Sequence, residues 1–368
     1  MFELSISKQH LLTPLLIVAG AVDKKQATVI LSNILLKLTN NQLRLTATDL
    51  EIEITACVPC IADQDDASIT VPAKKIIDII RSLEDDANPK LICKEGVMSI
   101  KAGRSQFKLT TLPADDYPAT EDEASEVEFT VNTLALVRLL QSTYFAMAQQ
   151  DVRIYLNGLF LEIDTQSITA VTADGHRMAI CRLPCQLINQ HHRLLIPKKG
   201  IQEMLRLLSH VTDENVVLSS SKNHFKIVTD QYIFSSKLIE ARFPPYIKAI
   251  PKDQDKSVII DRDILKRALS RIIIMANEKL RAVLLQIQPN TLTLIANNQE
   301  HEEGIESLAA ETEGDELHIG LNATYLLDVL NHVNEGPLRL SFSDTDSSIL
   351  VQSLQDENYQ YIIMPMKL

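Results

Sequence analysis

Thr70-Val71-Pro72-Ala73-Lys74 opens a short amphipathic stretch of this 368-residue sequence, and two related stretches follow it at a constant spacing. They are Leu195-Ile196-Pro197-Lys198-Lys199 and Ile319-Gly320-Leu321-Asn322-Ala323, so Pro72, Pro197 and Asn322 are 125 residues apart. Proline and asparagine both suit the start of a helix. Each stretch is therefore predicted to begin a helix in one of three copies of a repeated unit.

The segments around these helices repeat with nearly the same period. Alternating strands followed by amphipathic helices are predicted at 2–7 and 8–22, at 127–132 and 133–148, and at 257–261 and 262–275. Strand pairs joined by polar turns follow at 33–54, 157–180 and 281–296, with 43–54 and 168–180 each predicted as one strand. Further strands close the copies at 91–112, 215–239 and 338–366.

Each copy thus reads as strand, helix, strands, helix, strands. This order predicts an α+β fold in which two helices pack on an antiparallel sheet. The chain is too long for one hydrophobic core, and we predict domains at 1–122, 127–250 and 256–368. Segments containing Pro118 and Pro251 are the predicted linkers.

The composition is that of an ordinary globular protein, with 45% hydrophobic and 23% charged residues. Five cysteines, an odd number, favour a reducing compartment and free thiols. The pairs Cys57/Cys60 and Cys181/Cys185 look like two halves of a zinc site. However, they occupy equivalent positions in different copies, 124 residues apart, so we expect no metal and no other cofactor.

The apolar run 11–22 resembles the core of a secretory signal peptide. Glu3 stands where a basic residue belongs, Pro14 interrupts the run, and the repeat places counterparts of this helix deep in the chain. No stretch reaches the ~18 apolar residues of a membrane span. We therefore expect a cytoplasmic protein without a membrane partner.

Several short strings, in order along the whole chain, resemble those of one family. They are Leu11-Leu12-x-Pro14-Leu15, Thr48-Asp49-Leu50-Glu51, Leu156-Asn157-Gly158, Thr172-Ala173-Asp174-Gly175-His176-Arg177, Arg242-Phe243-Pro244 with Tyr246, Asn277-Glu278-Lys279 and Met364-Pro365-Met366-Lys367-Leu368. Together they resemble the β sliding clamps of bacterial DNA polymerase III. The resemblance implies a non-enzymatic processivity factor: a head-to-tail homodimer, closed into a six-domain ring around double-stranded DNA, that tethers polymerase subunits and the clamp loader.

The net charge of −12 speaks against a nucleic-acid partner unless the charge is unevenly distributed. We counted charges in the helical windows 7–25, 74–83, 132–148, 198–208, 262–275 and 322–333. These hold 14 Lys and Arg against five Asp and Glu, a net of +9, which leaves −21 elsewhere. Such segregation favours a basic lining for DNA within an acidic exterior, although basic residues also simply solvate exposed helix faces.

The resemblance also implies which residues act. Those expected near DNA are Lys25, Gln150, Lys198 and Lys199. The groove expected to take partner peptides contains Leu156, Gly175, His176, Arg177, Met178, Pro244, Asn322, Tyr325, Ser348, Ile362, Met364, Pro365, Met366 and Lys367. The dimer interface is expected to contain Ile79, Leu83, Phe107, Leu109, Ile274 and Met275.

Methionine adapts to several ligands, which suits a groove with many partners; the alternative is that the last strand is ordinary core. Four positions depart from the family pattern, namely Ala173, Lys248, Leu280 and Asp346, so the affinity for particular peptides stays open.

Two other functions are compatible with parts of the sequence. An enzyme would use Asp174 and His176 as an acid–base pair, but Asp174-Gly175 is typical of a turn and no nucleophile or phosphate loop accompanies it. A repeat scaffold would bind proteins but not DNA.

Overall fold

The computed structural model describes residues 2–23, 28–62, 66–118, 124–185 and 191–367. They form two compact units. The first unit contains Met1–Leu134 and Lys199–Leu238, and the second contains Ala135–Lys198 and Ile239–Leu368.

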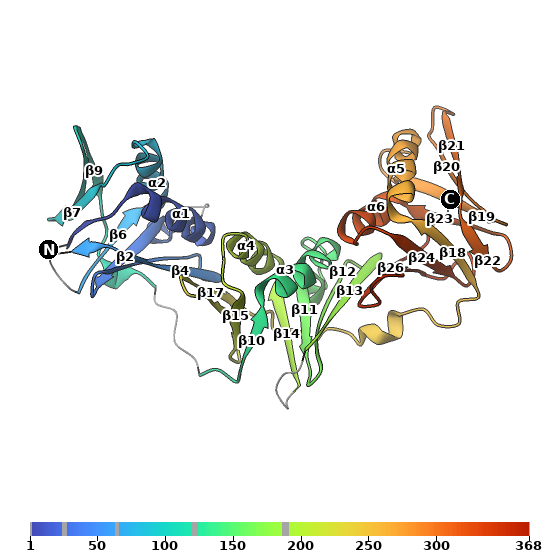
Figure 1. Ribbon diagram of the computed structural model, residues 1–368, viewed down its shortest axis with the longest axis horizontal. Helices are drawn as coiled ribbons and strands as arrows, with labels where there is room; N and C mark the ends of the chain where they lie inside the picture. Colours follow the sequence, from blue (N-terminus) through green and yellow to red (C-terminus); the bar gives the residue numbers. More distant parts are fainter. Residues whose placement is uncertain (1, 24–27, 63–65, 119–123, 186–190, 368) are drawn as a thin grey trace. The chain divides into compact units, whose positions relative to one another are not determined.

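The first unit holds an eight-stranded and a five-stranded sheet, both antiparallel throughout (Figure 1). In order across the larger sheet the strands are β10 (Val127–Asn132), β15 (Asn215–Ser220), β16 (His224–Val228), β17 (Tyr232–Lys237), β4 (Ile52–Pro59), β3 (Gln42–Thr48), β2 (Asn33–Thr39) and β6 (Ala67–Pro72). In the smaller sheet they are β5 (Ile61–Ala62), β1 (Phe2–Ser5), β7 (Lys90–Lys94), β8 (Val97–Ala102) and β9 (Ser105–Thr110).

Helices α1 (Lys8–Val18) and α2 (Ala73–Ser82) pack against each other in the first unit, and α1 also covers β3 and β4 (Figure 1). The Ser7 side chain caps α1 by accepting a hydrogen bond from the His10 amide. The third helix of this unit is α4 (Lys198–Leu208), whose first residue is assigned to the second unit. Each helix buries one apolar face, and the charged residues of α2 and α4 lie at least partly exposed, whereas Lys8 at the start of α1 is buried.

The second unit repeats this plan with a nine-stranded and a four-stranded antiparallel sheet. Across the larger sheet the strands are β14 (His192–Pro197), β11 (Gly158–Ile163), β12 (Ser167–Ala173), β13 (Arg177–Pro184), β26 (Tyr359–Ile363), β25 (Ile349–Ser353), β24 (Pro337–Phe342), β18 (Lys256–Asp261) and β22 (Glu311–Glu313). The smaller sheet contains β21 (Glu303–Ala309), β20 (Thr291–Asn297), β19 (Ala282–Gln288) and β23 (Leu317–Asn322).

Helices α5 (Arg262–Ile272) and α6 (Ala323–His332) pack side by side in the second unit (Figure 1). Asp261 caps α5 and Asn322 caps α6, because each side chain accepts hydrogen bonds from the first-turn amides. Helix α3 (Thr133–Gln141) begins in the first unit and continues into the second. The six predicted helices are therefore present, and every paired strand is antiparallel as predicted.

Two predictions of strand length were wrong, those for 43–54 and 168–180. Residues 43–54 form two strands, β3 and β4, because Asp49 Oδ1 accepts hydrogen bonds from the amides of Glu51 and Ile52 and closes a tight turn. Leu50 adopts φ +75° within it. The second copy turns in the same way, where Asp174 Oδ1 accepts from His176 and Arg177 between β12 and β13.

The larger sheets combine strands from successive copies of the repeat. In the first unit β4, from the first copy, pairs with β17, from the second. In the second unit β13, from the second copy, pairs with β26, from the third. The predicted limits of three domains stay a prediction, because the compact units are two and each contains parts of two copies.

All five cysteines are free thiols. Among the described residues there is no group of side chains arranged to hold a metal ion. Within the same residues, no helix is both long and apolar enough to cross a membrane.

Candidate functional site

The C-terminal segment of the second unit is held by backbone hydrogen bonds on both sides. Ile362 lies opposite Met178 in the β13–β26 ladder. Beyond the strand, the Met364 amide donates to the His176 carbonyl and the Met366 amide donates to the Gly320 carbonyl, each at 2.8 Å. These contacts fix the last residues as an ordered surface.

An apolar cluster lies on the sheet beside this segment. Its buried members are Phe160, Val171, Met178, Ile180, Leu195, Phe243, Tyr246, Leu350 and Ile362. The rings of Phe160 and Phe243 stack with centroids 4.9 Å apart. The Tyr246 hydroxyl donates to Glu162 at 3.0 Å, and burial together with this carboxylate raises the pKa of Tyr246 to about 12.

Three side chains next to this cluster remain open to a partner. Ile247 is 61% exposed and Met364 is 48% exposed, and Pro244 is also exposed. Exposed apolar side chains over an apolar base are typical of surfaces that bind another protein. The predicted groove is therefore placed on a surface with suitable chemistry.

Arg177 connects three segments at one end of this surface. Its guanidinium donates to Asp174 at 3.0 Å, to Asp328 of α6 at 2.5 Å and to the Phe145 carbonyl at 3.1 Å. It also lies over the Tyr325 ring, 4.6 Å from the centroid. A guanidinium with donors in several directions can hold such a junction, whereas an ammonium presents no planar fork.

The loop that contains Asp151 and Arg153, before β11, contacts the same end of this surface, next to Asp174. Arg153 donates to both carboxylate oxygens of Asp151 and to the Asp174 carbonyl. The hydrogen bonds from Arg153 lower the pKa of the Asp151 carboxyl to about 2. Gly175 has φ +92°, a backbone conformation that side-chain-bearing residues rarely adopt, which favours glycine at this position.

The structure brings together six of the predicted groove residues. Direct contacts and shared clusters link His176, Arg177, Met178, Tyr325, Ile362 and Met364, while Gly175 adjoins His176 in the chain and Met366 is bound to Gly320. Leu156 is buried behind the loop, Asn322 Oδ1 is bound to the Thr324 amide, and Pro365 is half-buried. Their roles in binding stay predictions.

Ser348 lies apart from these contacts, in a hollow of about 530 Å³ that Lys248 and Asp346 also line. Lys367 reaches toward it, with Nζ 3.8 Å from Asp346 Oδ1. Of the other departures from the family pattern, Ala173 packs on the apolar cluster and Leu280 is 54% exposed. The two polar departures, Lys248 and Asp346, therefore share one hollow.

Sequence reasoning missed Asp328, Phe145, Phe243 and Ile247. The string Arg242-Phe243-Pro244 with Tyr246 contained Phe243 without assigning it to the groove, and Ile247 directly follows this string. No sequence signal pairs Asp328 with Arg177, because they are 151 residues apart.

Several of the helix cations counted above are engaged within the protein. Lys8 is 8% exposed and donates to the Leu83 carbonyl, so it does not face a ligand. Arg206 donates to the carbonyls of Leu16 and Ile17. The charge count therefore overestimated the cations available to DNA. Lys74, Lys75, Arg138 and Arg267 are exposed on helices α2, α3 and α5. Arg81 and Arg271 are also exposed but pair with Asp78 and Glu306.

The four residues expected near DNA have different surroundings. Lys25 lies outside the described residues. Gln150 is exposed with φ +56°. Lys198 is half-buried and donates to the Met147 carbonyl, and desolvation lowers its pKa. Lys199 is exposed and pairs with Asp49. Their contact with DNA stays a prediction.

The expected dimer residues divide between interior and surface. Leu83 and Leu109 are buried, at 9% and 6% exposure, while Ile79, Phe107 and Met275 are half-buried. Ile274 is 76% exposed. Among the six expected interface residues, Ile274 alone has a largely exposed side chain.

The acid–base alternative finds no geometric support. Asp174 accepts hydrogen bonds from two backbone amides and from Arg177, and the structure has none between Asp174 and the His176 ring, both of which it describes. The His176 ring instead lies parallel to that of Tyr325, with centroids 6.2 Å apart.

Comparison with known proteins covers the whole chain. Models of the DNA polymerase III beta subunit match in three consecutive pieces, with the N-terminal domain at 2–121, the central domain at 130–245 and the C-terminal domain at 247–367. These matches confirm the prediction of three tandem copies of one kind of domain.

Relatives and solved structures agree. The beta sliding clamp of Pseudomonas putida is 41% identical over 99% of each chain, and that of Escherichia coli is 38% identical over 100%. The crystal structure of DNA polymerase III subunit beta from Pseudomonas aeruginosa is 40% identical and superposes over all of both chains with a TM-score of 0.96. A second structure from that organism, 41% identical with the same TM-score, is bound to griselimycin.

Proposed function

Because the chain belongs to the DNA polymerase III beta subunit family, we propose that two copies close head to tail into a ring of six domains, at 1–122, 127–250 and 256–368 of each copy. The protein is a sliding clamp, a processivity factor for DNA polymerase. In our proposal the ring encircles duplex DNA in the cytoplasm, holds polymerases and the clamp loader by their peptides, and performs no catalysis.

The observation that carries the ring is the way successive copies of the repeat join. Strand β4 pairs with β17, and 125 residues later the equivalent strand β13 pairs with β26. The equivalent of β4 in the third copy is β21, which begins 126 residues after β13, and the equivalent of β17 in the first copy is β9, which begins 127 residues before it. Strands β9 and β21 lie at the ends of their sheets, so each chain has two unpaired edges, and in our proposal a third junction of the same kind forms between two chains.

The repeat also supplies the register of that junction. Phe234 lies opposite Ile54 and Tyr361 lies opposite Ala179. Transferring both registers to the third junction places Phe107 of one copy opposite Ile305 of the other. Ile305 is 60% exposed and Phe107 is half-buried, so pairing would cover apolar surface and satisfy the open edge strands together. A heterologous contact of this kind closes into a ring when its rotation permits.

The DNA-facing surface follows from the helices. Their exposed cations, such as Lys74, Lys75 and Arg267, provide sequence-independent attraction to phosphates. The expected contacts of Lys25, Gln150, Lys198 and Lys199 add to it. Because the exposed cations are fewer than the sequence count, enclosure rather than tight local contact would retain the DNA.

The peptide-binding surface is the one around Met178, Ile362 and Met364. Flexible methionine side chains over an ordered apolar base can adapt to several peptides. The hollow containing Ser348 adds polar specificity at its margin.

Topology tests the ring directly. The protein is loaded onto nicked circular DNA by a clamp loader and washed in high salt, and the circle is then cut. We expect retention through the wash and loss on linearisation, because phosphate contacts weaken steeply with salt whereas a threaded ring does not. Loss in the wash, or retention after cutting, contradicts enclosure.

A separate measurement tests the peptide surface. Deletion of residues 364–368 should abolish polymerase binding and leave the dimer intact, since Met366 is bound to β23, at the opposite edge of its sheet from β21. Light scattering reports the dimer and a peptide titration reports the surface; a lost dimer or retained peptide binding would show the assignment wrong.

A further inference from the structure

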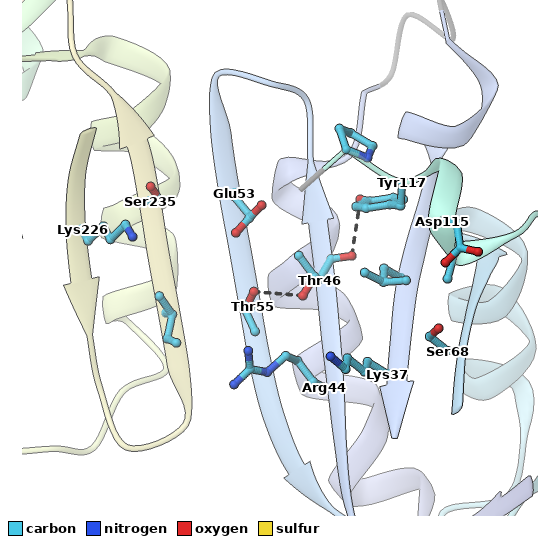
Figure 2. A pocket seen from close by; sticks show the side chains of 14 residues that line it. Lys37, Arg44, Thr46, Glu53, Thr55, Ser68, Asp115, Tyr117, Lys226 and Ser235 are labelled. Carbon is cyan, nitrogen blue, oxygen red and sulfur yellow. Dashed lines mark hydrogen bonds between the residues drawn. The ribbon is translucent and has the colours of Figure 1, made fainter. Parts of the chain in front are cut away.

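The first unit also contains a hollow. It lies on strands equivalent to those that carry the proposed peptide surface in the second unit. Strands β4 and β17 border it as β13 and β26 border the apolar cluster. Its volume is about 540 Å³, and Tyr117 covers one side (Figure 2). The Tyr117 hydroxyl accepts a hydrogen bond from the Thr48 amide and donates to the Thr46 carbonyl, which fixes that wall.

Two cations lie directly opposite each other at one end of this hollow. Lys37 on β2 and Arg44 on β3 are cross-strand partners, and Figure 2 shows them side by side. Both are exposed, and neither forms an ion pair with a residue that the structure describes. Like charges at opposed positions destabilise a sheet. The adjoining hollow of about 260 Å³, which both residues also line, contains no carboxylate among its lining side chains.

At the equivalent positions of the second copy, the positive charge is balanced by a carboxylate. Glu162, 125 residues after Lys37, lies between Thr169 and Arg193 across the strands. Arg193 donates to Glu162 at 2.8 Å. The same position of the repeat thus carries an internal ion pair in one copy and two opposed cations in the other, so the first copy lacks the carboxylate that its counterpart supplies.

A buried hydroxyl points to a ligand independently. Ser235 is 4% exposed and lines the hollow, and its Oγ has no hydrogen-bond partner among the described residues. It differs from the neighbouring hydroxyls of Thr46 and Thr55, which bind each other at 3.0 Å (Figure 2). A buried polar atom without a partner costs free energy that a ligand can recover.

We propose that this hollow binds an acidic peptide in an extended conformation, with a carboxylate on Lys37 and Arg44 and a polar group on Ser235. The two ends of the site are four residues apart along the strands, and Ser235 lies two strands from Arg44 and three from Lys37 across the sheet, which makes the separation roughly 16–19 Å. A single small anion cannot reach both ends, whereas about six residues of extended chain can. Glu53 and Asp115, which also line the hollow, disfavour a continuous polyanion such as nucleic acid.

The test uses the full chain without DNA or polymerase, so its outcome is independent of ring closure and of the apolar surface. A fluorescent eight-residue peptide with glutamate at its first two positions and serine at the other six is titrated by anisotropy. We expect saturable binding that weakens with salt, and no binding of the matching peptide with glutamine. The double variant Lys37→Gln/Arg44→Gln should lose at least about tenfold in affinity, and Ser235→Ala about threefold.

The matched control is Lys94→Gln/Lys222→Gln, which removes two exposed cations from the same unit outside the hollow. It should bind within twofold of the unaltered protein. Equal losses in both double variants would show unspecific charge attraction and overturn the site, as would unchanged affinity in Lys37→Gln/Arg44→Gln. An oligothymidylate of eight nucleotides that competes as well as the acidic peptide would also overturn it.

Discussion

Arg177 and Asp328 form a hydrogen-bonded ion pair of 2.5 Å between β13 and helix α6. The Arg177 side chain is 12% exposed and that of Asp328 is 30% exposed, so water screens this pair only in part. Helix α6 carries Tyr325, which lies under the same guanidinium. The pair therefore connects the proposed peptide surface with a helix of the third copy.

Asp328→Asn should lower the free energy of unfolding by about 1–2 kcal/mol, because it leaves a largely buried guanidinium with one charged partner fewer. Urea unfolding measures the change. The control is Asp78→Asn, which removes the exposed 3.6 Å pair with Arg81 and should cost less than about 0.5 kcal/mol. Equal effects of the two substitutions would refute a structural role for the Arg177–Asp328 pair.

Ile305→Asp should convert the dimer to a monomer, since it would place a charge opposite Phe107 in the proposed junction. Light scattering at several protein concentrations gives the mass. Ile61→Asp is the control, because Ile61 is 76% exposed on β5, at the other end of the same sheet as β9. A dimer of unchanged affinity in Ile305→Asp would exclude the register derived from the repeat.

The loop at Asp151 should respond to acid. Its folded pKa of about 2 lies below the ordinary value for aspartate, so the contribution of the ionised carboxyl to stability is complete above about pH 4. That contribution is lost as the pH falls toward 2. The melting temperatures of the unaltered protein and Asp151→Asn should therefore converge over this interval.

Carboxyl NMR provides the direct measurement for Asp151. Arg153→Gln should move its titration midpoint upward, because the hydrogen bonds from Arg153 are the main cause of the low pKa. An unchanged midpoint in this variant would assign the shift to another group.

Arg44→Glu should stabilise the first unit by about 0.2–1 kcal/mol, since it replaces opposed cations with a cross-strand ion pair to Lys37. Thermal unfolding at low salt measures the effect. The double variant Lys37→Glu/Arg44→Glu restores like charges and should lose the gain. Destabilisation by Arg44→Glu alone would mean that the two cations are not strained in the free protein.

Local patterns predicted much of the fold. The 125-residue period located all six helices, because apolar residues at helical spacing and the residues at helix starts act over a few positions. The turn at Asp49 was missed within 43–54 because the strands on both sides continue the same apolar alternation. The motif at 172–177 located one end of the groove for a similar local reason, since Asp174 caps its own turn.

Contacts between distant residues could not be read in this way. The Lys8 side chain points inward because it donates a hydrogen bond to the Leu83 carbonyl, 75 residues away in the chain. Asp328, which accepts from Arg177, is 151 residues away from it. The opposed cations Lys37 and Arg44 were each ordinary surface residues in the sequence, and only the β2–β3 register placed them together.

The sequence by itself determined the repeated α+β unit, its three copies and its family, because these depend on periodicity and on short motifs that persist along the chain. Only the tertiary structure decided which strand edges join, since any exposed edge offers the same backbone donors and acceptors and the choice depends on packing across the whole unit. That choice joined β4 to β17 and β13 to β26, and it left β9 and β21 at the ends of their sheets.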